Sequence, residues 1–107
     1  MGDRMSVHSD DMELPMPDGG SIVLHQTVGV PKRVWLDPTR NVFRYSKSKE
    51  RVWIISPAKH IEGEMRSSTY TWVGRNPDGS IQVNAFDGCI YQLDGETGMA
   101  TFVEWEK

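Results

Sequence analysis

Histidines, the side chains best suited to acid–base or metal chemistry, are few and widely spaced in this chain of 107 residues. The three histidines, His8, His25 and His60, have no spacing that would set two of them on one face of a helix or strand, as a metal site requires. His60 stands near Glu62 and Glu64, which could form an acid–base or metal cluster, but we interpret this stretch as a solvated loop. We interpret His25 as a half-exposed structural residue of a strand. We therefore expect no metal site and no cofactor.

The chain also lacks the motifs of nucleophilic and phosphate chemistry. It contains no serine elbow, no phosphate-binding glycine loop and no cysteine pair. The single cysteine, Cys89, lies in an apolar stretch, and we interpret it as a buried, unreactive thiol. The acids Asp78, Asp87, Asp94 and Glu96 could gather Ca²⁺ if their loops met, but Asp-Gly pairs also form turns without any metal. We predict that the protein is not an enzyme.

Basic and aromatic residues alternate in the middle of the chain, between residues 32 and 53. Residues 32–75 hold ten Lys or Arg against four acids, whereas both flanks are acidic and the net charge is −3. Such a segment could bind single-stranded nucleic acid, since cations contact phosphates and aromatic rings stack on bases. The acidity of the whole chain and the need of strands for aromatic residues favour contact with a protein partner or a second copy instead. The basic candidates for this contact are Arg44, Lys47, Lys49 and Arg51.

The last third of the chain, residues 76–105, alternates apolar and polar residues between three turn signals, which is typical of an antiparallel β-meander. A two-residue turn at Asp87-Gly88 would pair Ala85 with Ile90. With that register both faces of the sheet are apolar, so each face needs a cover. The rest of the chain would cover one face, and a helix, loop, second subunit or partner the other. The candidates for an apolar contact are Phe86, Tyr91, Met99 and Trp105.

The pattern of the whole chain predicts one β domain over residues 16–107, after a flexible N-terminal tail of residues 1–15. We predict an all-β fold of about eight short antiparallel strands in two meanders, packed as a small sandwich or a partly open barrel. At most one short helix is expected, near residues 57–65. Similar turns at Pro17-Asp18-Gly19 and Pro77-Asp78-Gly79 suggest duplicated meanders, at 16–56 and 67–107. Few residue types form tight turns, however, so similar turn sequences also arise without duplication. Strands predicted in the first half include residues 33–36, 41–45 and 51–56.

The stretch from Ser67 to Gly98 contains DGSIQV followed by DGCIYQLDGETG. This order of glycine turn, strand, second glycine turn, aromatic residue, Leu-Asp and Thr-Gly resembles one blade of the quinoprotein-type β-propellers. The resemblance implies a blade-like sheet covered on both faces. Because propellers have typically four to eight blades and this chain could supply two at most, it implies neither a closed propeller nor its cofactor site. The matching residues are Asp87, Gly88, Tyr91, Leu93, Asp94, Thr97 and Gly98.

Together these patterns predict a non-enzymatic protein-binding module. It would be an accessory, inhibitor or immunity-type protein, or a β subunit that completes its core by oligomerising. The alternative is binding of single-stranded nucleic acid through residues 32–53. No apolar run approaches the roughly 20 residues that span a bilayer, and the N-terminus lacks a signal-peptide core. We expect a soluble, cytoplasmic protein, which also suits its single cysteine.

Overall fold

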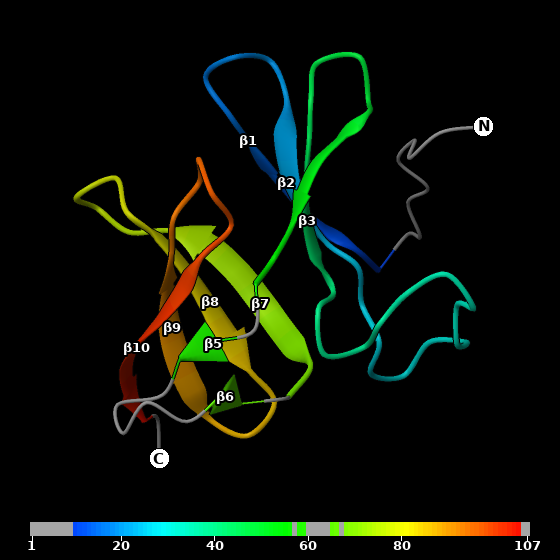
Figure 1. The fold of residues 1–107 in the computed structure, drawn as a ribbon, viewed down its shortest axis with the longest axis vertical. Helices are drawn as coiled ribbons and strands as arrows, with labels where there is room; N and C mark the ends of the chain where they lie inside the picture. Colours follow the sequence, from blue (N-terminus) through cyan, green and yellow to red (C-terminus); the bar gives the residue numbers. More distant parts are fainter. Residues whose placement is uncertain (1–9, 57, 60–64, 67, 106–107) are drawn as a thin grey trace.

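The computed structural model describes residues 10–56, 58–59, 65–66 and 68–105, which form two β-sheets (Figure 1). The first sheet contains, in spatial order, β1 (Met12–Pro15), β2 (Ser21–Leu24), β3 (Val42–Tyr45) and β4 (Arg51–Ile54). The second contains β7 (Tyr70–Arg75), β8 (Ile81–Ala85), β9 (Cys89–Leu93) and β10 (Ala100–Trp105), with the short β5 (Ala58–Lys59) and β6 (Met65–Arg66) beyond β10. Neighbouring strands are antiparallel, except that β5 lies parallel to β10. The described residues contain no helix.

The prediction of an all-β fold built from two antiparallel meanders is confirmed. The expected tail of residues 1–15 is wrong at its end, because Met12–Pro15 forms the edge strand β1 and pairs with β2. Most of the stretch near 57–65 lies outside the described residues, and its described parts are the strands β5 and β6. The described part of the chain contains no helix with the length and hydropathy needed to cross a bilayer.

The main core lies between the two sheets, because alternate residues of each strand point toward the opposite sheet. Ile22, Leu24 and Val42 supply this face in the first sheet, and Val83 and Tyr91 supply it in the second. A smaller core lies on the outer face of the first sheet. Its buried members are Val23, Leu36, Phe43 and Tyr45. The sheet with two apolar faces is therefore the first sheet, and the chain's own loop after β2 covers its outer face.

The turn between β8 and β9 differs from the predicted two-residue turn. The N–H of Gly88 donates to the Ala85 carbonyl at 3.0 Å, and Gly88 takes a φ of 93°, so three residues form the loop. Val83 consequently pairs with Tyr91, one residue away from the expected register. Since a one-residue shift moves every side chain to the other face, Ile81, Val83, Tyr91 and Leu93 all point into the core. The predicted second apolar face of this sheet is wrong.

The residues between β2 and β3 also differ from the prediction. Arg33–Leu36 forms a turn and not a strand, with the Leu36 N–H donating to the Arg33 carbonyl at 3.1 Å. The alternation of charged and apolar residues that predicted a strand at 33–36 has another cause. Arg33 turns back to bind Asp11, while Leu36 packs into the smaller core. This loop and the 86–88 turn lie at the lower end in Figure 1, whereas the turns that join β1 to β2, β3 to β4 and β9 to β10 lie at the upper end.

The turn after β9 joins the upper ends of the two sheets. The carbonyl of Gly95 accepts from Trp53 Nε1 at 2.9 Å and from an Arg44 guanidinium nitrogen at 2.6 Å. Arg44 also pairs with Asp18 at 2.8 Å. Gly98 has a φ of 79°, and a Cβ atom built on it would lie 2.7 Å from the Trp53 ring. The close fit of this glycine against an indole ring fixes the distance between the sheets at this end.

A buried polar network and the groove beside it

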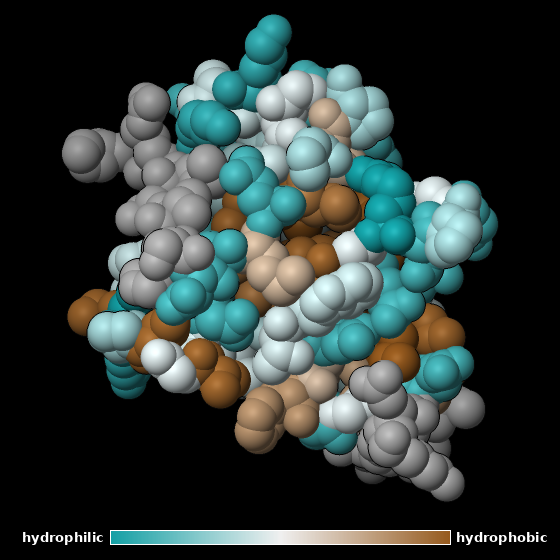
Figure 2. All heavy atoms as spheres, turned by 180° about the vertical axis from the view of Figure 1, so that it is seen from behind, coloured by the Kyte–Doolittle hydropathy of each residue, from teal (hydrophilic) through white to brown (hydrophobic). Residues whose placement is uncertain are grey.

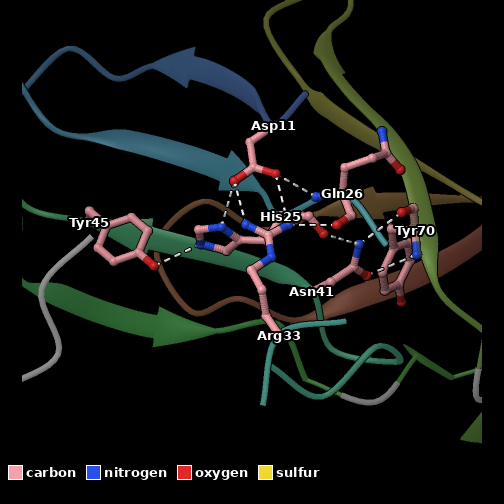
Figure 3. Close-up of polar contacts among 7 residues, drawn as sticks. All are labelled: Asp11, His25, Gln26, Arg33, Asn41, Tyr45 and Tyr70. Carbon is pink, nitrogen blue, oxygen red and sulfur yellow. Dashed lines mark hydrogen bonds and ion pairs between the residues drawn. The ribbon is translucent and has the colours of Figure 1, made fainter. Parts of the chain in front are cut away.

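A buried carboxylate organises the lower end of the molecule. Asp11 has a fully buried side chain that binds Arg33 through two bonds of 2.9 Å, one to each oxygen. It also accepts from the Gln26 N–H at 2.7 Å and lies 3.0 Å from His25 Nδ1. Figure 3 shows the His25 ring and the Arg33 guanidinium side by side, both facing the Asp11 carboxylate. Because buried charges are costly unless they are paired and hydrogen-bonded, this carboxylate keeps its partners in fixed positions.

His25 continues this network toward the smaller core. Its ring is completely buried, and Nε2 lies 2.8 Å from the Tyr45 hydroxyl. An ionised carboxylate can only accept, so the neutral ring donates from Nδ1 to Asp11 and accepts from Tyr45 at Nε2. The rings of Trp35 and Phe43 each lie edge-on to it, with centroids 5.0 Å away. The expectation of a half-exposed His25 is wrong, because the loop after β2 closes over it.

The side chain of Asn41 joins the two sheets behind this histidine. Its Nδ2 donates to the carbonyls of His25 and Tyr70 at 2.9 Å each, and its Oδ1 accepts from the Tyr70 N–H at 2.9 Å. The amide therefore pairs with β7 as a peptide group would. Thr27 and Thr69 add a hydroxyl contact of 2.6 Å beside it. These bonds hold the loop after β2 against the start of β7.

An Asp–His–Tyr arrangement resembles a proton relay, but its geometry does not allow catalysis on a substrate. Tyr45 is 2% exposed and Asp11 and His25 have fully buried side chains, so no substrate atom can reach them. Catalytic acids and bases must lie within hydrogen-bonding distance of the reacting group. We assign this network the role of holding Gln26 and the neighbouring loop in place. Among the described residues, no group of three or more His, Cys, Asp or Glu is placed to hold a metal ion.

A groove opens directly beside the network, at the border between the two sheets. It has a volume of about 400 Å³ and is lined by Asp10, Gln26, Val28, Thr71 and Phe86. The loop after β2 supplies Gln26 and Val28, β7 supplies Thr71, and the 86–88 turn supplies Phe86. We call this the Phe86 groove.

Hydrogen bonds to the buried network fix the backbone of Gln26 in the wall of the Phe86 groove. The Gln26 carbonyl accepts from Arg33 at 2.5 Å while its N–H donates to Asp11, so both backbone groups of this residue are fixed. Figure 3 shows the Gln26 side-chain amide turned away from Asp11 and His25. Its Oε1 is buried and has no hydrogen-bond donor among the described residues. Buried polar atoms nearly always have partners, so this oxygen is an exception, and it belongs to a residue that lines the groove.

Apolar side chains are exposed at several places on the surface. Figure 2 shows hydrophilic residues over most of the rear face, with separate groups of apolar residues between them. The most exposed beside a groove are Phe86, at 68%, and Met99, at 55%. Met99 lines a second groove of about 300 Å³ with Gln92, Asp94 and Thr101, at the other end of the second sheet. No side-chain polar atom of that second groove is among the buried atoms without a partner, so the Phe86 groove is the stronger candidate.

The predicted contact residues are not brought together. Phe86 is exposed in the groove, and Met99 is exposed elsewhere. Tyr91 is 1% exposed in the main core, where burial raises the pKa of its hydroxyl, so its predicted role in a surface contact is wrong. The side chain of Trp105 lies outside the described part of the structure. The sequence prediction missed Gln26, because no local pattern marks a side chain whose orientation depends on a carboxylate 15 residues earlier.

The predicted basic surface is also divided. Arg44 is only 9% exposed and is bound to Asp18 and Gly95, so its predicted role in a charged contact is wrong. Lys47, Lys49 and Arg51 are exposed at the upper end, in and beside the 46–50 turn. Phe43 and Tyr45 are buried and cannot stack on bases, which removes two aromatic residues from the nucleic-acid interpretation of residues 32–53.

No known protein-family model, curated protein or solved structure matches the chain. The interpretation of the groove therefore depends on its own geometry.

The burial of His25 predicts a loss of stability in mild acid. Burial lowers its pKa below the usual value near 6.5, as does the charge of Arg33, while Asp11 opposes both. The unfolded chain then binds a proton at a higher pH than the folded chain does. The free energy of unfolding should fall as the pH drops below about 6.5, by at most about 1.4 kcal/mol per pH unit from this group.

Urea unfolding at pH 7, 6 and 5 measures this dependence, and His25→Gln should flatten it. The proton on Cε1 of His25, followed by NMR, should show the ring still neutral at a pH where an exposed histidine is charged. Equal or greater stability of the unaltered protein at pH 5.5 would contradict the assignment of a neutral buried ring.

Proposed function

We propose that this protein is a non-enzymatic protein-binding module whose contact surface is the Phe86 groove. The observation that carries the proposal is that one groove is lined both by a strongly exposed aromatic ring, Phe86, and by Gln26, whose buried Oε1 has no donor among the described residues. Exposed aromatic residues supply much of the binding energy at protein interfaces, and a polar atom beside them selects the partner. Val28, which is 48% exposed, extends the apolar surface on the other side of the groove.

The architecture supports binding more than chemistry. The wall of the groove is held by fully or largely buried groups, Asp11, Arg33 and Asn41, so the surface is formed before a partner arrives. A preformed surface loses little conformational freedom on binding, which favours affinity. The side chains of Asp11 and His25 are fully buried behind the groove. The partner in this proposal is another protein or a second copy of the chain.

The proposal is tested by cross-linking and by affinity. A photoreactive phenylalanine at position 86 should capture a defined partner, or a second copy, whereas the same group at Val52 should not. Val52 is a matched control because it is 53% exposed on β4, away from the groove. With the purified partner, Phe86→Ser should weaken binding at least tenfold, about 1.4 kcal/mol, while Val52→Ser should change the dissociation constant less than about twofold. Equal effects of the two variants would reject the groove as the contact surface.

A further inference from the structure

The outer face of the second sheet carries a row of uncharged residues. Gly74 of β7, Gln82 of β8, Gln92 of β9 and Thr101 of β10 follow one another in register across four neighbouring strands (Figure 1). Both sequence neighbours of Gln82, of Gln92 and of Thr101 belong to the main core or pack against it, so the row faces away from the core. Three strand spacings of about 4.8 Å make the row roughly 14 Å long.

An indole ring covers the first position of this row. Trp72 stands two residues before Gly74 on the same strand, and a Cβ atom built on Gly74 would overlap carbon atoms of the Trp72 ring. The ring therefore lies over the glycine, in the space that any other side chain would fill. Trp72 is still 38% exposed, so the ring rests on the sheet and remains accessible from outside. We call these four positions, with the indole over the first, the Trp72 row.

The polar groups of the Trp72 row include both donors and acceptors. Gln82 Nε2 donates to Asn84 Oδ1 at 2.8 Å, and Asn84 pairs in register with Trp72. This bond orients two amides beside the indole, and each amide has further hydrogen-bonding capacity, the Asn84 nitrogen as a donor and the Gln82 oxygen as an acceptor. The exposed Gln92 amide and Thr101 hydroxyl can both donate and accept. These four side chains are uncharged, which suits a neutral ligand rich in hydroxyl groups.

The Trp72 row continues into the second groove. Gln92 and Thr101 line this groove of about 300 Å³ together with Asp94 and Met99. Met99 is 55% exposed and adds apolar contact at the end of the row opposite the indole. Two positions of opposite charge lie at this end, Asp94 in the groove and Lys59 next to Thr101 in register. One ligand could therefore contact a continuous surface from the indole to the groove.

We propose that the Trp72 row binds an extended, neutral oligosaccharide, an inference that goes beyond the protein contact at the Phe86 groove. A sugar ring with equatorial hydroxyls has flat faces of C–H groups, which pack on the electron-rich face of an indole. Its rim of hydroxyls both donates and accepts, as the amides of Gln82 and Gln92 do. A straight chain of such rings, as in cellulose, repeats these features, and the length of the row suits about three rings.

Titration of the full chain with cellotetraose, followed by NMR, tests the proposal. The sugar should shift the indole N–H signal of Trp72 and the signals of Gln82, Gln92 and Thr101. Maltotetraose has the same glucose units in a curved chain and should bind at least about threefold more weakly, because fewer of its rings can contact a straight row. Raised salt should change the affinity for cellotetraose by less than about twofold, because the ligand is uncharged.

Two outcomes of these titrations contradict the proposal. The absence of any shift in the Trp72 row at about 10 mM cellotetraose would reject a sugar site there. Equal binding of cellotetraose and maltotetraose would reject an extended chain as the ligand.

Variants locate the binding. Trp72→Ala should weaken cellotetraose at least about tenfold, since the stacking surface is lost, whereas Trp72→Phe keeps a ring and should weaken it less. Gln92→Ala removes one exposed amide and should weaken binding about three- to tenfold, without disturbing the fold. Trp35→Ala is the matched control, because Trp35 is 48% exposed and packs against Phe43 of the first sheet. Unchanged binding by Gln92→Ala, or equal effects of Trp72→Ala and Trp35→Ala, would reject the row as the site.

The sugar site and the proposed protein contact can be tested separately. Phe86→Ser should leave the affinity for cellotetraose within about twofold, because Phe86 lies in the turn after β8, outside the Trp72 row. A loss equal to that of Trp72→Ala would instead place the sugar in the Phe86 groove and reject the proposal. Cross-linking at position 86 decides on the protein contact independently of either result.

Discussion

Replacing Asp11 with alanine should lower the free energy of unfolding by about 3–5 kcal/mol, the largest effect expected from a single substitution here. The change leaves the Arg33 guanidinium and the buried His25 ring without their carboxylate, and it removes the acceptor of the Gln26 N–H. An uncompensated buried charge costs far more than the net stabilisation that a paired one provides. The loop after β2 and the strand β1 should loosen together, because this carboxylate connects them.

Urea unfolding measures this effect, and Glu13→Ala serves as its control. Glu13 lies in the neighbouring strand β1 with an exposed side chain, so its loss should cost less than about 0.5 kcal/mol. Asp11→Asn keeps the size of the side chain but not its charge and should fall between the two. A cost below about 1 kcal/mol for Asp11→Ala would show that the network contributes little to the fold.

Replacing Gly98 with alanine should cost about 2–4 kcal/mol of stability, for two separate reasons. Its φ of 79° is unfavourable for any residue with a Cβ atom, and that atom would lie 2.7 and 2.8 Å from carbon atoms of the Trp53 ring. The ring cannot move away easily, because Trp53 Nε1 is bound to the Gly95 carbonyl. The substitution should therefore force the sheets apart at the upper end.

Gly29→Ala separates the two reasons. Gly29 has nearly the same φ, 77°, but a Cβ atom there would have no neighbour within 4 Å. Its substitution should cost only the conformational part, about 1–2 kcal/mol. Thermal or urea unfolding of both variants gives the steric part as the difference, and equal costs would show that the Trp53 ring adjusts without strain.

The sequence was sufficient to predict the fold class, because alternation and turn residues act locally. Asp18-Gly19 and Asp78-Gly79 do form the predicted turns, and each aspartate accepts the N–H two residues later. The register after Ala85 was not predictable in this way. Asp-Gly suits both a two-residue and a three-residue loop, and the choice depends on which face the main core can bury.

The candidate site was less predictable than the fold. Phe86 was proposed from a register that placed it on a second apolar face of the sheet, and it is exposed although that register is wrong. Asp11 and Gln26 could not be proposed, since their roles depend on Arg33, which returns to the start of the chain from 22 residues away. Long-range polar contacts of this kind leave no periodic signal. The blade-like resemblance and the duplication of the meanders stay predictions.

The core shared by the two sheets has a consequence for how the chain can be divided. Each meander buries its inner face against the other, so either meander produced in isolation would expose a continuous apolar surface to water. A gene fragment encoding residues 16–56 or 67–107 would then produce a protein that pairs with itself or aggregates.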